Sequence, residues 1–156
     1  MAEFEFARDA GAQIFDPGEG SSARRARLLA HLAGLRLAVS SIELEVDGET
    51  VTLRGQVDQP VEREKLILAA GNVARISRVD DRLVTVRPGP PARFHVVAAG
   101  ETLATISAAY CGDAARYPAI LEANRPMLQD PDGIYPGQVL RIPSLASGPG
   151  GRPSGA

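Results

Sequence analysis

The side chains that could do acid–base or metal chemistry are few in this sequence, and they lie apart. His31 and His95 fall in different parts of the chain, so a two-histidine metal site or a Ser-His-Asp arrangement has little support. The adjacent Asp80 and Asp81 could suggest calcium, but neighbours on a strand point to opposite faces. Residues 130–133 resemble the start of a calcium loop that lacks its closing Glu. We therefore predict that the protein is not an enzyme.

Composition limits the partners as well. The 17 basic and 19 acidic residues give a net charge of −2, which argues against broad binding of nucleic acid or anionic membranes. One short stretch holds three arginines, Arg24, Arg25 and Arg27. They form either a solvated helix face or a small patch that binds an anion or a partner. Cys111 is the only cysteine, which excludes an internal disulfide framework. The charged first 15 residues do not resemble a secretory signal, and no apolar run approaches the roughly 18 residues of a membrane helix. We expect a cytoplasmic protein.

Hydrophobic periodicity predicts an α+β unit in the first half of the chain. Residues 1–20 are expected to form an amphipathic helix and a turn, because apolar and small residues recur there at helical spacing. A second helix is predicted from residue 21 to 34, and alternation then predicts a hairpin over residues 42–57. Pro60 opens another helix, and residues 79–86 form the last strand. The residues that carry the first helix are Phe4, Ala7, Gly11, Ile14 and Phe15.

A proline-rich stretch separates a second unit. Residues 88–93 are predicted to be a short, stiff linker, since Pro and Gly continue neither helix nor strand. The pattern then predicts a strand, two helices and a strand between residues 94 and 143. The tail, residues 144–156, is rich in Gly, Ser and Pro and is expected to be disordered.

The second unit resembles a LysM domain, a βααβ fold. "FHVVAAGETLATISAAY" supplies the first strand and the Gly-x-Thr-Leu helix start, and "GIYPGQVLRIP" supplies the closing turn and strand. Glu101 stands where that family usually has Asp. The resemblance implies a groove for peptidoglycan fragments or N-acetylglucosamine. Its residues would be Gly100, Thr102, Ile134 and Pro136.

Residues 21–87 resemble a BON domain, an αββαβ fold. The hairpin with Gly48 and Gly55 and the Val-Asp-Asp before the last strand carry this resemblance, whereas Arg75-Ile76 replaces the usual Gly-Val pair. A BON domain followed by a LysM domain, preceded by "FARDAG" and no signal peptide, resembles the bacterial cytosolic potassium-binding BON–LysM protein family. That family implies a potassium sensor or buffer that becomes more compact when the ion binds. We expect a monomer with contact between the two units.

Potassium is best held by neutral carbonyl oxygens, and the last four carbonyls of a helix lack an intrahelical partner. "AAGNVARIS" contains such a helix end, where Gly71 and Asn72 tolerate left-handed backbone angles. With the family resemblance, we expect the N-terminal segment and this helix end to enclose K⁺, or Rb⁺ or Cs⁺ in its place. The alternative is that Gly71-Asn72 only ends the helix and that the small N-terminal residues only pack. The expected ligands are the carbonyls of Ala7, Ala10, Gly71, Val73 and Ile76. An adaptor that binds other proteins is a third reading.

Overall fold

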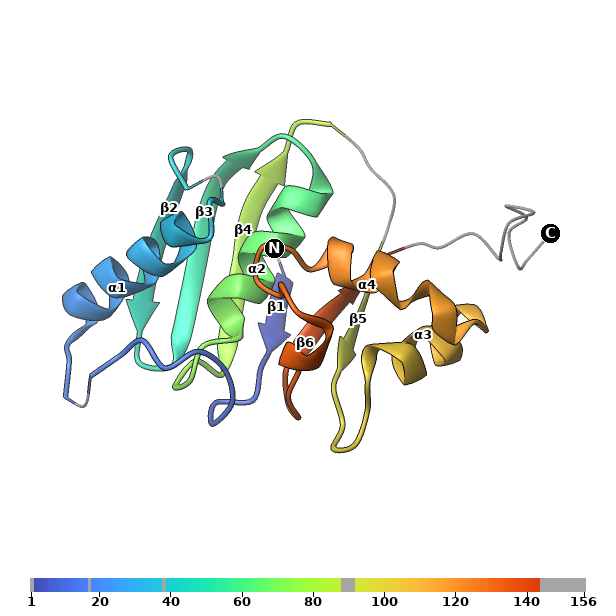
Figure 1. The fold of residues 1–156 in the computed structure, drawn as a ribbon. Coiled ribbons are helices and arrows are strands. Elements are labelled where there is room, and N and C mark those ends of the chain that lie inside the picture. Colours follow the sequence, from blue (N-terminus) through green and yellow to red (C-terminus); the bar gives the residue numbers. More distant parts are fainter. Residues whose placement is uncertain (1, 17, 38, 88–91, 144–156) are drawn as a thin grey trace.

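The chain folds into an α+β structure in which a four-stranded sheet and a two-stranded sheet lie next to each other (Figure 1). The computed structural model describes residues 2–16, 18–37, 39–87 and 92–143. Most of the predicted linker, residues 88–91, and the predicted tail, residues 144–156, lie outside the described residues. None of the described helices is long and apolar enough to cross a membrane.

The larger sheet has four strands and carries two helices. Its elements are β1 (Ala2–Glu5), α1 (Ser21–Gly34), β2 (Ile42–Asp47), β3 (Thr50–Val57), α2 (Pro60–Gly71) and β4 (Arg78–Thr85). The strand order is β1-β4-β3-β2, with β4 parallel to β3 and the two other pairs antiparallel. Both helices pack on the same face of the sheet (Figure 1). The helix, hairpin, helix and strand predicted after residue 20 are therefore all present.

The alternation of side chains along the strands explains this layer. Leu44 and Val46 of β2 are buried, whereas Glu43 and Glu45, which alternate with them, are exposed. A strand with one apolar face must cover it, and the apolar stripes of α1 and α2 do so. The fully buried side chains of this core include Leu28, Leu32, Val51, Leu53, Leu66 and Ile67.

The first residues form a strand, so the predicted N-terminal helix is wrong. β1 pairs antiparallel with β4, with Phe4 opposite Val79. Phe4 and Phe6 alternate with Glu3 and Glu5, and this period of two decides the conformation because the edge of β4 offers backbone partners. The described residues between β1 and α1 form no helix either, and residues 6–12 run as an irregular segment along the loop between α2 and β4.

The smaller sheet belongs to the second unit. Its elements are β5 (Arg93–Val96), α3 (Leu103–Cys111), η1 (Ala114–Arg116), α4 (Tyr117–Ala123), η2 (Pro131–Gly133) and β6 (Val139–Ile142). β5 and β6 pair antiparallel, and both helices pack against them around a separate core that includes Ile106, Ile120 and Leu140. The second of the two helices predicted in this unit is divided into the 3₁₀ turn η1 and α4. The remainder of the βααβ prediction is present.

The two units contact each other directly. Figure 1 shows β1 and α2 of the first unit next to β6 of the second unit, where the two sheets meet. Val139 of β6 is buried in the core of the first unit, and the rings of Phe4 and Phe94 meet edge to face with centroids 5.4 Å apart. Arg141 of β6 forms a buried ion pair with Glu64 of α2, with Nε and Oε1 2.6 Å apart.

Candidate functional site

The end of α2 is shaped by a close approach of the N-terminal segment. A Cβ added to Gly71 would lie 2.2 Å from two atoms of the Phe6 ring, so any larger residue there would displace the ring. The predicted left-handed angles at Gly71-Asn72 are not found: Gly71 ends the helix and Asn72 has φ −81°. Within residues 71–77, the residue in the left-handed region is Arg75, with φ 81°. Glycine is therefore needed at position 71 for space.

The N-terminal segment, residues 6–12, is hydrogen-bonded along the loop that follows α2. At its two ends, the Phe6 N–H donates to Ser77 O at 2.9 Å and the Ala12 N–H donates to Asn72 O at 3.0 Å. Gly11 has φ 112°, and a Cβ there would lie 2.4 Å from Asn72 O. The structure thus brings together the two segments that contain the five predicted ligand residues.

This docking changes where the backbone amides after α2 donate. In a continuing helix, the N–H groups of Ala74 and Arg75 would bond the carbonyls of Ala70 and Gly71. Instead they donate to Ala12 O at 2.9 Å and to Arg8 O at 2.6 Å. The carbonyls at the end of α2 are thereby released from these two amides, as a site built from neutral oxygens requires.

Two predicted ligands already accept a turn hydrogen bond. Ala7 O accepts from Ala10 N–H at 3.1 Å, and Val73 O accepts from Ile76 N–H at 3.0 Å. A carbonyl oxygen has two lone pairs, so such a bond leaves one for a cation. Among the described residues, no three His, Cys, Asp or Glu side chains gather into a group that could hold a metal ion.

The second unit also reaches these segments. A Cβ added to Gly137, in the turn before β6, would lie 3.0 Å from Ala7 Cβ and 3.3 Å from Ala10 Cβ. The Asn72 side chain is 6% exposed and bonds both backbone groups of Val139 on β6. Sequence reasoning singled out Asn72 only as part of the helix end and missed its contact with β6, because nothing in the local pattern identifies a partner 67 residues away.

A polar pocket of about 360 Å³ opens beside the same two segments. Its wall includes the side chains of Arg8 and Asp9, between Ala7 and Ala10, and those of Ala74 and Arg75, between Val73 and Ile76. Arg8 Nε donates to Glu49 Oε2 at 2.6 Å, and this bond lowers the pKa of Glu49. The pocket therefore combines charges of both signs next to the candidate ion site.

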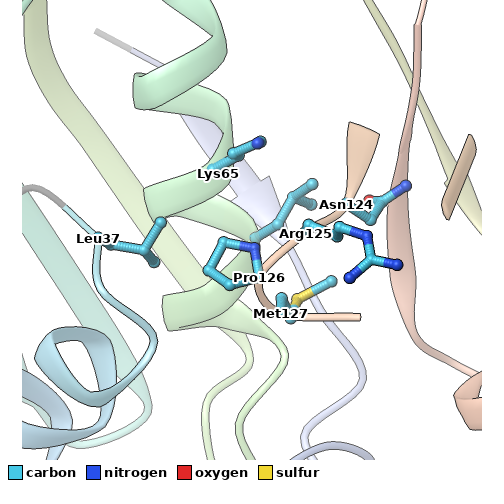
Figure 2. Close-up of a pocket in the computed structure, with 7 residues that line it drawn as sticks. Leu37, Lys65, Asn124, Arg125, Pro126 and Met127 are labelled. Carbon is cyan, nitrogen blue, oxygen red and sulfur yellow. The ribbon is translucent and has the colours of Figure 1, made fainter. Parts of the chain in front are cut away.

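A second, apolar crevice lies between α2 and the loop after α4. Figure 2 shows Lys65 on one side and Pro126 and Met127 on the other, with Leu37 close by. The crevice has no room for a water molecule, and burial lowers the pKa of Lys65. It is a packing seam between the units.

The residues predicted to bind sugar lie in two loops of the second unit. Gly100 has φ 86° in the turn before α3, and Thr102 Oγ1 accepts from Thr105 N–H at 3.1 Å, so Thr102 caps the helix. Ile134 and Pro136 lie between η2 and β6. Val97 joins the bases of the two loops, because it donates to Gln138 O and accepts from Gly137 N–H, both at 2.8 Å. The loops therefore leave the same end of the β5–β6 pair.

The fold and the matched families define a class of protein, a BON domain followed by a LysM domain. Residues 21–88 match the BON domain family, and residues 95–143 match the LysM domain family. The chain is 36% identical over 148 residues to the Potassium binding protein Kbp of Escherichia coli O6:H1, covering 92% of this chain and 99% of that protein. This chain belongs to the family of that protein, which confirms the resemblance drawn from the sequence.

A second relative extends the comparison. An uncharacterized protein of Deinococcus radiodurans is 32% identical over 118 residues, which cover 69% of this chain. The matched part is 46% of that protein, so the chain spans less than half of its length.

Proposed function

We propose that this protein is a cytosolic potassium-binding protein whose ion lies where the N-terminal segment meets the end of α2. One observation carries the proposal. The N–H groups of Ala74 and Arg75 donate to the carbonyls of Ala12 and Arg8, and not to the last carbonyls of α2. The name of the Escherichia coli relative, Potassium binding protein Kbp, supports the choice of ion. The proposed ligands are the carbonyl oxygens of Ala7, Ala10, Gly71, Val73 and Ile76.

A set of neutral oxygens suits a large, weakly hydrated cation better than a divalent ion, which favours carboxylates. Rb⁺ and Cs⁺ are expected to substitute for K⁺ on the same grounds. Because the ligands come from two segments, occupancy would stabilise the docked N-terminal segment. The contact of Gly137 with Ala7 and Ala10 extends this effect to the LysM unit, so we expect the ion to favour the compact molecule. A protein of this kind would serve as a potassium sensor or buffer.

The test is thermal unfolding in KCl, RbCl, NaCl and CaCl₂ at matched ionic strength. A ligand present at about 100 times its Kd stabilises the folded state by about 2.7 kcal/mol, so a site of useful affinity raises Tm by several degrees. We expect the rise in KCl and RbCl only. Equal melting temperatures in all four salts would reject the proposal.

The LysM unit favours a second candidate function, binding of peptidoglycan fragments. The observation behind it is that the loops with Gly100 and Ile134 leave the same end of the β5–β6 pair. Sedimentation with insoluble peptidoglycan in NaCl tests it, with Pro136→Ala as the variant. Retention of the wild-type protein and its loss in the variant would support glycan binding. No retention would leave the LysM unit as a scaffold.

A further inference from the structure

On the edge that faces away from β5, the backbone of β6 is hydrogen-bonded to two asparagine side chains. In an antiparallel pair, alternate residues point their N–H and C=O groups toward the partner strand. Val139 and Arg141, two residues apart, share the edge that faces away from β5. Asn72 accepts from Val139 N–H at 2.8 Å and donates to Val139 O at 2.7 Å. Asn124 accepts from Arg141 N–H at 2.7 Å and donates to Arg141 O at 2.9 Å.

The two asparagines differ in origin. Asn124 ends α4 and belongs to the same unit as β6, so its contact is made whenever that unit is folded. Asn72 follows α2 and belongs to the other unit, so its contact exists only when the two units are docked. Both side chains are buried, Asn72 at 6% and Asn124 at 2% exposed. The same chemical contact thus occurs once between the units and once within the LysM unit.

Asn72 is also part of the candidate ion site. It lies between the proposed ligands Gly71 and Val73, and its own carbonyl oxygen accepts from Ala12 N–H of the N-terminal segment. A paired amide needs its plane aligned with the strand edge, so both bonds to Val139 depend on the backbone orientation at residue 72. One residue therefore joins α2, the N-terminal segment and β6.

We propose that Asn72 is a positioning residue that couples potassium binding to docking of the LysM unit, by pairing with the β6 edge only when residues 71–73 hold the ion-bound conformation. The inference rests on the proposed function and names the contact that transmits it. Loss of the ion would let residues 71–73 relax and return both Val139 groups to water. If potassium binding favours docking, docking must favour potassium binding by the same factor. Removing the Asn72 amide, which weakens docking, must therefore weaken potassium binding too.

Amide hydrogen exchange in the wild-type chain is the first measurement. In saturating KCl, Val139 N–H should exchange about tenfold more slowly than in NaCl of equal ionic strength, as its bond to Asn72 forms. Arg141 N–H, held by Asn124, should change much less. Equal Val139 exchange in the two salts, in a protein that binds potassium, would overturn the coupling.

The variants Asn72→Ala and Asn124→Ala provide the second measurement, by small-angle scattering and potassium titration. At saturating potassium, N72A should keep the larger radius of gyration of the wild type in NaCl, with about tenfold weaker potassium affinity. N124A should lose stability but retain the compaction and the affinity. Full compaction of N72A in KCl, or an equal loss of affinity in both variants, contradicts the proposal. A wild-type chain that does not bind potassium overturns the proposed function itself, and the coupling with it.

Discussion

At the scale of single residues, small side chains decide which segments can meet. Gly71, Gly11 and Gly137 each stand where an added Cβ would lie 3.0 Å or less from another segment. Their neighbours across the contact are the Phe6 ring, the Asn72 carbonyl and the Ala7 methyl. The candidate ion site thus depends on the absence of side chains, because backbone oxygens can converge only where backbones approach closely.

Replacing Gly71 with Ala should destabilise the protein by about 1–3 kcal/mol and weaken potassium binding, because the new methyl displaces the Phe6 ring. Urea unfolding and potassium titration measure the two effects. Gly34→Ala is the matched control, since Gly34 also ends a helix but has no atom within 4 Å of an added Cβ. That control should be neutral or stabilising, by up to about 1 kcal/mol.

A double-mutant cycle sharpens this prediction. The ring atoms nearest to Gly71 are Cε1, Cζ and Cε2 of Phe6, which a leucine lacks. The variant Phe6→Leu/Gly71→Ala should therefore be more stable than the sum of the single changes predicts, by at least about 0.5 kcal/mol. Additive effects would show that the two residues do not compete for the same space.

The buried phenol of Tyr135 should make the protein less stable at high pH. Burial raises the pKa of its phenol to about 12, although a bond from Gln138 acts in the opposite direction. The unfolded chain releases this proton near pH 10, so the contribution to stability is complete below pH 10 and is lost as the pH rises toward about 12. The free energy of unfolding, measured with urea at pH values from 9 to 12, should fall less steeply in Tyr135→Phe than in the wild type. Parallel curves would contradict the assignment.

At the scale of elements, α2 is held by contacts at its start, its middle and its end. Its start is fixed by Glu62, whose Oε2 accepts from Asp58 N–H at 2.9 Å and Gln59 N–H at 3.3 Å. Its middle holds β6 through Glu64 and Arg141, and its end receives the N-terminal segment. A shift of α2 would therefore act on the candidate site and on the LysM unit together.

The Glu64–Arg141 pair should behave as a buried ion pair. The side chains are 8% and 7% exposed, so Glu64→Ala leaves a charged guanidinium buried without its partner and should cost about 3–5 kcal/mol. Glu122→Ala breaks the exposed pair with Arg125 and should cost about 1 kcal/mol or less. Urea unfolding compares the two. A similar, small cost in both variants would show that the pair between the units is hydrated in solution.

At the scale of the whole molecule, two separate cores meet at direct contacts between the units. Phe4 meets Phe94, Glu64 meets Arg141 and Asn72 meets Val139, whereas each unit has its own buried core. Because each unit has its own core, we expect this joint to open without unfolding either unit, as the proposed closure on ion binding requires.

We expect small-angle scattering to report this joint. In the wild type, the radius of gyration should be smaller in KCl than in NaCl of equal ionic strength, because the ion stabilises the docked segments. Far-UV circular dichroism should be the same in both salts, since only the arrangement of the units changes. A constant radius with clear potassium binding would mean that the ion is held without closure.

The sequence by itself determined most of the helices and strands described between residues 21 and 143, and the family, because periodic apolar residues and turn motifs act locally. Period two and period 3.6 were both compatible with the first residues, and only pairing with β4 selected the strand. The partners of Asn72 and Glu64 in the other unit could not be predicted from the sequence either, since the local pattern around a buried amide or carboxylate does not identify a distant partner. The tertiary structure also shows that glycine at position 71 makes room for the Phe6 ring and does not serve a left-handed backbone angle. The sequence could not show this, because the contact with Phe6 arises only after the chain has folded.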